Sequence, residues 1–411
     1  MLNLEIMIMK YLGLLVILGF CEICIAQDFW LKQDTPEGFH ARDMASNDDS
    51  WIYLGTNDGV YFSNNNGEDI VKLGLENTIL SVAINSQNNI LAGSGPIYYS
   101  QDDGVSWIEK TTPSNVNTIF INDNKLIYGY WGGIYLSENF GFDWNPVLNT
   151  DLSQLITCII QKDNSTYFAG STAFMGGGGV YRSFDGGDNW SLIGLLDYYI
   201  QSLAIDSNGT LYAASIGNEG IGIYKSNDDG ENWTPLKTNV FVSSVLITID
   251  DIIFIGCTNE HGTQGGVFRS NDYGATWELI NSGLNDISNQ DVEGLCLTKN
   301  GYLYCYGEHL HRSAEPVIES IYDCNHSGED FSVFPNPAND FLFISSNNQN
   351  SLINDIKINI YDSFGRCVYS DKTNQILTQS INISNFANGL YSVKIEYNNK
   401  KFLNQFIKLY Q

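Results

Sequence analysis

Short segments in which hydrophobic and polar residues alternate recur along most of the chain. In residues 202–215 (SLAIDSNGTLYAAS), two such segments flank Asn208-Gly209, a dipeptide that accepts the positive φ of a tight hairpin turn. A short segment that ends in serine follows (GIYKS, ending at Ser226), and then a glycine-containing turn and a segment that begins with tryptophan. The pattern predicts four antiparallel strands joined by three hairpins.

This four-strand unit is repeated along the chain. Each copy is marked by a serine at the end of its third strand, and successive serines are 37 to 46 residues apart. The seven serines are Ser63, Ser100, Ser137, Ser183, Ser226, Ser270 and Ser313. A sheet of this kind buries both faces only when neighbours stack against it, so the units are expected to close into a ring. The sequence predicts an all-β chain in which a seven-bladed β-propeller, residues 27–316, precedes a small C-terminal β-sandwich.

The start of the propeller is predicted to complete its last blade. The seventh unit, at Ser313, lacks the glycine turn and the tryptophan strand. The segment around Trp30 (DFWLKQDTPEG) is similar to the segment that follows the turn in other units. We expect Trp30 and Leu31 to supply the outer strand of the seventh blade, because this closure removes exposed sheet edges.

The turn after the third strand has the pattern Ser-x-Asp-x-Gly-x-Thr-Trp. We expect its carboxylate to accept backbone N–H groups, its glycine to adopt a positive φ and its tryptophan to pack over the blade edge. Four copies keep the serine, aspartate, glycine and tryptophan: Ser100, Asp102, Gly104 and Trp107; Ser183, Asp185, Gly187 and Trp190; Ser226, Asp228, Gly230 and Trp233; Ser270, Asp272, Gly274 and Trp277. The copies at Ser63 and Ser137 are degenerate, with Asn65 and Asn139 in place of the aspartate.

These turns resemble the Asp-box, or BNR repeat, of sialidases, sortilin-like receptors and xyloglucanases. The resemblance implies the seven-bladed propeller of that superfamily. Local carboxylate-to-backbone hydrogen bonds explain the spacing of the motif. We therefore interpret its aspartates as structural residues rather than as catalytic or calcium-binding ones.

The last eighty residues have a different character. Residues 331–411 contain alternating segments, glycine-centred turns and a lysine-rich final segment, which predict a β-sandwich after a linker at 317–330. The region resembles the type A C-terminal sorting domain of the type IX secretion system in Bacteroidetes. The residues that carry the resemblance are Pro335, Asn336, Pro337, Gly365, Gly389 and Tyr391. The resemblance implies that the type IX secretion machinery is a partner and that the chain crosses the outer membrane.

Residues 1–26 are predicted to be a signal peptide. Lys10 precedes an apolar run, and Ala26 is a small residue at which a signal peptidase could cut. The run is shorter than the roughly 20 apolar residues of a spanning helix, and Glu22 interrupts it. We expect export to the periplasm, a mature chain without a transmembrane anchor, and a final location at the outer cell surface or in the medium.

Composition narrows the function further. The chain has 47 acidic and 20 basic side chains and a net charge of -27, which repels phosphate backbones, so no nucleic-acid partner is predicted. The cysteines after the signal peptide show neither a CxxC pair nor a His–Cys cluster with zinc spacing. We predict no metal site and no cofactor.

The strand register can be predicted for one pair of cysteines, Cys296 and Cys305. If Asn300-Gly301 forms a two-residue hairpin loop, Cys296 and Cys305 lie directly opposite each other. This register leaves two alternatives, a cross-strand disulfide or two buried thiols.

Sialidases and glycoside hydrolases each need particular active-site residues. A sialidase needs three converging arginines, but Arg182, Arg269 and Arg312 all precede the repeat serine on a peripheral strand. Arg366 lies in the sorting domain, which leaves only Arg42. A xyloglucanase-like glycoside hydrolase needs two carboxylates about 5 to 10 Å apart. Its candidate loop carboxylates are Asp43, Asp197, Glu219, Glu260, Asp291 and Glu293. The glycoside hydrolase is the alternative to the binding function below.

The preferred hypothesis is a non-catalytic module that binds a glycan or a protein. Residues 173–179, 216–222 and 258–266 are predicted to be enlarged loops on the propeller face opposite the Asp-box turns. With nearby aromatic residues they would form a ligand face. Its candidate residues are Tyr130, Trp131, Phe174, Tyr198, Tyr199, Glu219, Glu260 and His261. The other interpretation of these loops is that they are glycine-rich and mobile, without a ligand.

Overall fold

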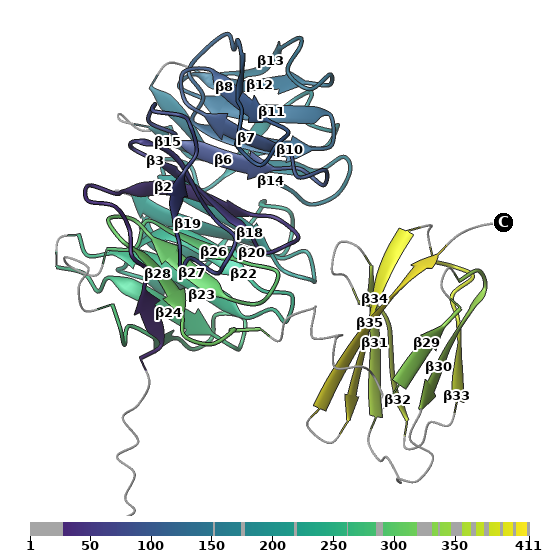
Figure 1. The fold of residues 1–411 in the computed structure, drawn as a ribbon. Coiled ribbons are helices and arrows are strands. Elements are labelled where there is room, and N and C mark those ends of the chain that lie inside the picture. The colour runs from purple at the N-terminus through teal and green to yellow at the C-terminus, as the bar shows by residue number, and fades with distance from the viewer. Residues whose placement is uncertain are drawn as a thin grey trace, which may run out of the picture.

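A computed structural model shows an all-β protein in which a propeller is followed by a β-sandwich, as predicted (Figure 1). The structure describes residues 28–150, 153–173, 177–217, 220–260, 262–284, 291–318, 331–335, 338–346, 356–362, 367–373, 378–386, 389–397 and 400–408. The predicted signal peptide lies outside the described residues. Within them, no helix is long and apolar enough to span a membrane.

Between Trp30 and Ser313 the described residues form seven four-stranded antiparallel sheets, which we number as blades 1 to 7. Blades 1 to 3 consist of β2 (Ala41–Ser46), β3 (Ile52–Thr56), β4 (Gly59–Ser63) and β5 (Val71–Lys72); β6 (Ser81–Ile84), β7 (Ile90–Gly93), β8 (Ile97–Ser100) and β9 (Ile108–Lys110); β10 (Thr118–Asn122), β11 (Lys125–Tyr130), β12 (Gly133–Ser137) and β13 (Asn145–Asn149).

Blades 4 to 7 follow the same order of strands. They consist of β14 (Gln154–Gln161), β15 (Tyr167–Ala173), β16 (Gly179–Ser183) and β17 (Ser191–Gly194); β18 (Ile200–Ile205), β19 (Leu211–Gly217), β20 (Gly220–Ser226) and β21 (Thr234–Thr238); β22 (Phe241–Ile247), β23 (Ile253–Thr258), β24 (Gly266–Ser270) and β25 (Glu278–Leu279); β26 (Gly294–Leu297), β27 (Leu303–Tyr306), β28 (Leu310–Ser313) and β1 (Trp30–Lys32). The third strand of every blade ends at the repeat serine that the sequence singled out.

The sheets form a closed ring. The first strand of each blade contacts the first strand of the next, and β26 contacts β2. The closing strand is the one predicted: β1 pairs antiparallel with β28, with Trp30 opposite Ser313 and Leu31 opposite Arg312. The Trp30 side chain is 1% exposed, and its Nε1–H donates to the Ile280 carbonyl at 2.6 Å.

A small residue in the second strand lets neighbouring blades approach each other. A Cβ atom added to Gly93 would lie 2.8 Å from Val116 Cγ1 of the next blade, closer than van der Waals contact allows. Five blades have glycine at this position: Gly55, Gly93, Gly129, Gly170 and Gly256. Blade 5 has Ala214 there, and blade 7 has Tyr306.

The Ser-x-Asp-x-Gly turns have the hydrogen bonds expected of a self-capped turn. In the copy at Ser183, the serine hydroxyl donates to Asp185 Oδ1 at 2.8 Å and accepts the Gly187 N–H at 2.9 Å, and Asp185 Oδ1 also accepts the Asn189 N–H at 2.9 Å. The Asn189 side-chain amide donates to Asp185 Oδ2, and these bonds lower the pKa of Asp185 to about 2. All four aspartates of the complete copies are exposed on the surface, which fits a structural role.

The two copies that looked degenerate keep the same hydrogen-bonded geometry with exchanged partners. Asn139 Oδ1 accepts the Ser137 hydroxyl and the Asp143 N–H, and Asn139 Nδ2 donates to Asp143 Oδ2 at 2.8 Å. In the complete copy the carboxylate comes first, at Asp185, and the amide comes four residues later, at Asn189. Asn65 and Asp69 repeat the exchanged arrangement. In the copies at Ser63, Ser137, Ser183 and Ser226 the turn pairs one amide with one carboxylate, in either order. In the other two copies a hydroxyl, of Ser106 or Thr276, donates to the carboxylate in place of the amide.

This exchange leads to a prediction for blade 3. Asn139→Asp should lower the unfolding temperature by a few degrees, because it places a carboxylate against that of Asp143. Adding Asp143→Asn should recover the wild-type value, as thermal unfolding followed by circular dichroism would show. An unchanged single variant, or a double variant less stable than the single one, would contradict a stabilising role for the amide–carboxylate pair in this turn.

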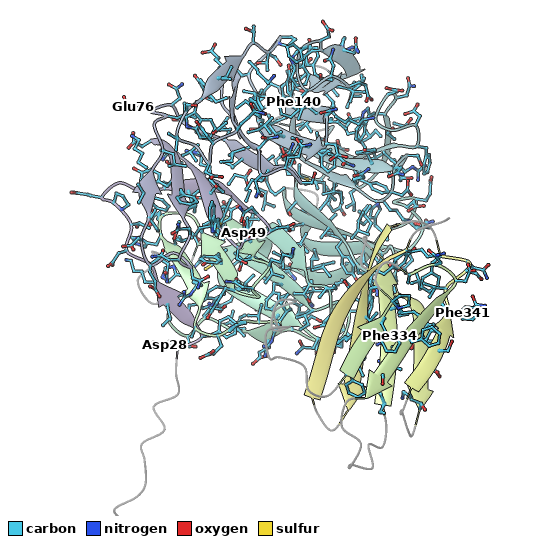
Figure 2. All side chains as sticks on the ribbon, turned by 45° about the vertical axis from the view of Figure 1, so that its right-hand side comes forward. Asp28, Asp49, Glu76, Phe140, Phe334 and Phe341 are labelled. Carbon is cyan, nitrogen blue, oxygen red and sulfur yellow. The ribbon has the colours of Figure 1, made fainter. Side chains whose placement is uncertain are left out.

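The C-terminal sandwich has two sheets. One consists of β29 (Phe331–Phe334), β30 (Phe341–Ser346) and β33 (Thr378–Asn382), and the other of β31 (Ile356–Asp362), β32 (Cys367–Thr373), β34 (Gly389–Tyr397) and β35 (Lys400–Lys408). Between them lies a core of isoleucines that includes Ile358, Ile360 and Ile395. Phe334 and Phe341 lie on the outside of the sandwich, exposed by 45% and 48% (Figure 2).

The motif residues of this region fall at different places in the sandwich. Gly389 begins β34, and Tyr391 is buried in the core. Pro335 follows β29 directly, whereas Asn336, Pro337 and Gly365 lie outside the described residues. Before the sandwich, Val317 packs against blade 7 and Ile318 is 7% exposed, so the chain still contacts the propeller at the start of the predicted linker.

Candidate functional site

A cavity of about 440 Å³ lies at one end of the channel that the ring encloses. Its wall is formed by the first strands of the seven blades, near the residues at which these strands begin. The lining is mostly polar and includes Asp43, Ser81, Gln201, Ser243 and Glu293. These residues come from blades 1, 2, 5, 6 and 7, so the cavity depends on closure of the whole ring.

One ring of side chains at this cavity joins successive blades. Ser81 Oγ accepts the Ile119 N–H, and Ser202 Oγ accepts the Val245 N–H, both at 3.2 Å. Ser244 bonds to the Leu295 N–H in the same way, and in blade 1 the acceptor is Asp43. These bonds run from blades 1, 2, 5 and 6 to the next blade and help to hold the channel wall in place, because a buried N–H group needs an acceptor.

The junction between blades 7 and 1 departs from the repeat. Tyr306 occupies the position at which five blades have glycine, and it is 8% exposed. The residue that packs at this junction from blade 1 is Ala41, whereas the corresponding residues of other blades are larger, as in Val116 and Ile156. Gly294 makes room for the Tyr306 ring, which lies close to it. Large and small residues have exchanged places at this junction alone among the described ones.

Asp43 is the half-buried carboxyl group of this junction. Its Oδ1 accepts the Met44 N–H at 2.8 Å and its Oδ2 accepts the Val82 N–H at 2.9 Å. The hydroxyls of Ser81 and Tyr306 also bond to it. Burial raises the pKa of Asp43 despite these bonds, and burial together with the nearby Asp43 charge raises the pKa of Tyr306 well above its ordinary value. Tyr306 therefore stays protonated as a donor to Asp43.

Three further ionisable side chains lie at the mouth of the cavity or beside it. Glu293 Oε1 pairs with His40 Nε2 at 2.8 Å, and the Glu293 side chain is 39% exposed. Arg42, which is exposed and lines the cavity, donates from Nε to Asn57 Oδ1 at 2.6 Å. Arg42 and Glu293 are both described in the structure and lie on neighbouring blades, but they do not form an ion pair with each other.

The predicted ligand face does not coincide with this cavity. None of its described members, Tyr130, Trp131, Tyr198, Tyr199 and Glu260, lines the cavity. Tyr130 packs against Tyr135 with ring centroids 5.2 Å apart, and Tyr198 packs against Tyr224 at 5.3 Å, so both belong to aromatic clusters within their blades. Trp131 is 39% exposed. Phe174, Glu219 and His261 lie outside the described residues, and the ligand face stays a prediction.

The candidate carboxylates separate into two groups. Asp43 and Glu293 both line the cavity. Asp197 and Asp291 instead hold backbone: Asp197 Oδ1 accepts the Gly177 N–H, and Asp291 Oδ1 accepts the Asn259 N–H, both at 2.6 Å. Glu260 is exposed away from the cavity.

Two details of the sequence prediction were wrong. Leu295, not Cys296, lies opposite Cys305, and neither cysteine forms a disulfide. The cause is a three-residue loop, in which Gly301 has φ +88° and donates to the Thr298 carbonyl, so the register moves by one residue. The described residues of the predicted loop at 216–222, which are 216–217 and 220–222, instead extend the β19–β20 ladder as far as Gly217 opposite Gly220.

Tyr306, His40 and Gln201 were missed as site residues. A signal for Tyr306 exists in the repeat, because the second strands read LGT, LAGS, IYGY, FAGS, YAAS and FIGC but YCYG in the seventh. A bulky residue that interrupts a run of small ones marks a changed junction. Among the described residues, no group of three or more His, Cys, Asp or Glu side chains gathers as metal ligands do.

Comparison with known proteins defines the class of protein. Residues 332–409 match the family described as the secretion system C-terminal sorting domain, which confirms the predicted sorting domain. The match indicates export through the type IX secretion system, to the cell surface or the medium. The chain is therefore an exported β-propeller protein with a C-terminal sorting domain. A search of curated proteins finds no match.

Solved structures share the propeller fold with this chain. PorZ of Porphyromonas gingivalis has 16% sequence identity and a TM-score of 0.56, over 94% of this chain and 61% of PorZ. The extracellular domain of BT4673 from B. thetaiotaomicron has 13% identity and a TM-score of 0.59, over 84% of this chain and 47% of that domain. The GH74 enzyme of Niastella koreensis has 15% identity and a TM-score of 0.56, over 92% of this chain and 74% of the enzyme. The chain thus spans about half to three fifths of the first two, and these likenesses show the fold alone.

Proposed function

We propose that this chain is a non-catalytic binding module that recognises a glycan or protein-derived ligand at the mouth of the propeller channel. The observation that carries the proposal is the bonding of Asp43. Two backbone N–H groups and two hydroxyls already bond to its carboxylate. Glu293 is then the only lining carboxylate with an oxygen that no described residue bonds. A glycosidase needs two carboxyl groups that can act on the substrate, whereas a binding site does not need a catalytic pair.

The route of export completes this proposal. A signal peptide at residues 1–26 would bring the chain to the periplasm, and the sorting domain would then take it through the outer membrane. Support comes from two of the similar structures, since PorZ is described as a bacterial surface component and the BT4673 structure as an extracellular domain. We also propose residues 27–316 as the propeller and 331–411 as the sorting domain.

A glycoside hydrolase is the second candidate. Its support is the presence of Asp43 and Glu293 in one cavity, together with the similarity to a GH74 enzyme. In this candidate Asp43, whose pKa is raised by burial, would be the acid and Glu293 the second carboxylate.

Binding and hydrolysis can be separated with the mature chain from Gln27 onward. We expect an array of glycans and immobilised peptides to retain the chain, and no reducing ends to appear when it is incubated with plant and host polysaccharides. Glu293→Gln should weaken retention. Hydrolysis that Glu293→Gln or Asp43→Asn abolishes would instead establish the glycoside hydrolase.

A further inference from the structure

The ring of bulged residues at the channel mouth offers an internal comparison between blades. One residue per blade occupies the start of the first strand, opposite the small residue of the second strand. The seven residues are Arg42, Leu80, Asn117, Thr157, Gln201, Ser243 and Glu293. All seven line the cavity, so whatever enters it meets their side chains.

Three of these side chains are used to hold the ring together. Asn117 donates to the Ile156 carbonyl at 2.9 Å, Thr157 to the Ile200 carbonyl at 2.6 Å, and Ser243 to the Val292 carbonyl. Each bond runs to the next blade, as a structural bond in a repeat would. The hydroxyl hydrogens of Thr157 and Ser243 are used in these bonds, whereas Asn117 keeps its Oδ1 and one N–H.

The other three polar side chains keep polar atoms that no described residue bonds. Arg42 uses only Nε, for Asn57, and its two terminal nitrogens are left over. Glu293 uses Oε1, for His40, and Oε2 is left over. The Gln201 amide, which is partly exposed in the wall of blade 5, has no hydrogen bond among the described residues.

Arg42 and Glu293 have opposite charges on neighbouring blades and yet do not pair. Asn57 and His40 hold them in place instead. A guanidinium with two unbonded terminal nitrogens matches a carboxylate with two parallel hydrogen bonds, and a carboxylate matches an ammonium group. The two side chains together are therefore complementary to a molecule that carries both charges a short distance apart.

We propose that the cavity binds a small zwitterion, either an α-amino acid or a short peptide with free ends. This inference rests on the binding function proposed above. Arg42 would hold the carboxylate, Glu293 the ammonium group, and Gln201 an amide or a polar side chain of the ligand. The cavity volume of about 440 Å³ is in the usual range for small-ligand sites. The net charge of -27 disfavours a purely anionic ligand, whereas a zwitterion carries no net charge.

The test compares free and blocked ends of the same molecules. Saturation-transfer NMR would measure binding of the mature chain to a pooled library of tripeptides, to the same library acetylated at the N-terminus, and to the same library amidated at the C-terminus. A mixture of free α-amino acids and a set of neutral oligosaccharides complete the panel. We expect the free-ended pools to bind, and either block to weaken binding about tenfold or more, the effect of losing a charged hydrogen-bonded pair.

Variants assign each end of the ligand to one residue. In Arg42→Gln the free-ended library should bind about tenfold more weakly, and amidation of the C-terminus should make no further difference. In Glu293→Gln the free-ended library should also bind about tenfold more weakly, and acetylation of the N-terminus should make no further difference. Arg269→Gln, which removes a guanidinium paired with Glu278 in blade 6 away from the cavity, is the matched control and should bind like wild type.

The possible outcomes separate this inference from the binding function itself. If blocked peptides or neutral oligosaccharides bind as well as free-ended peptides, and Glu293→Gln weakens them, the cavity is a binding site but the zwitterion is wrong. If no member of the panel binds and the glycan and peptide array also retains nothing, the proposed binding function fails as well. Equal binding of all three tripeptide libraries to wild type would overturn the inference without reference to any variant.

Discussion

Trp30→Ala should lower the free energy of unfolding by about 3–5 kcal/mol, the usual cost of removing a fully buried large aromatic side chain. Trp30 is 1% exposed, packs among Leu284, Val292 and Leu303, and donates its indole N–H to the Ile280 carbonyl. It also belongs to the strand that closes the ring. Denaturation by guanidinium chloride, followed by tryptophan fluorescence and circular dichroism, would measure the loss.

Trp131→Ala is the matched control for this prediction. Trp131 is 39% exposed and lies on the rim of blade 3, so its removal should cost less than about 1 kcal/mol. Two tryptophan variants of similar stability would show that β1 does not support the ring in the way described.

The second large effect is expected at the exchanged junction between blades 7 and 1. Ala41→Ile alone should destabilise by about 1–3 kcal/mol, because the added carbons meet the buried Tyr306 ring. Tyr306→Gly alone should cost about 3–5 kcal/mol, as expected when a buried aromatic side chain is removed. Combining the two substitutions recreates the arrangement of the other junctions, so Ala41→Ile should stabilise the Tyr306→Gly background. Chemical denaturation of the four proteins gives the coupling energy.

Tyr306→Phe separates packing from hydrogen bonding at this junction. The ring remains but the hydroxyl that bonds to Asp43 is lost, at a cost of about 1–3 kcal/mol. Ala41→Ile should still destabilise this variant, since the clash is with the ring. Additive costs of Ala41→Ile and Tyr306→Gly, without a change of sign, would show that the two residues do not exchange places as proposed.

The repeat made most of the propeller predictable. A serine that ends a strand, followed by a self-capped turn, is a local pattern. Its hydrogen bonds join residues that are close in sequence, as in Ser183, Asp185 and Gly187. The closing strand could be predicted as well, because the seventh unit lacked a segment that the residues around Trp30 resembled. Closure of the ring then follows from the need to bury both faces of each sheet.

The site was harder to predict because it depends on exceptions to the repeat. The cavity joins residues that are far apart in sequence, such as Arg42 and Glu293, and only ring closure brings them together. The described residues of the predicted ligand face lie outside the cavity, and Tyr130 and Tyr198 pack against other tyrosines. The cysteine register failed for a local reason, since a loop of two residues and a loop of three fit the same Asn-Gly signal.

Hydrogen exchange of the mature chain tests the closed ring most directly. The backbone of β1 bonds to β28, and the Gln33 N–H donates to the Leu310 carbonyl at 2.9 Å. A peptide covering residues 28–35 should therefore exchange slowly in native buffer, at rates similar to those of a peptide covering 308–315, as mass spectrometry would show. Complete exchange of the 28–35 peptide within seconds, while 308–315 stays protected, would contradict closure of the ring by its N-terminal strand.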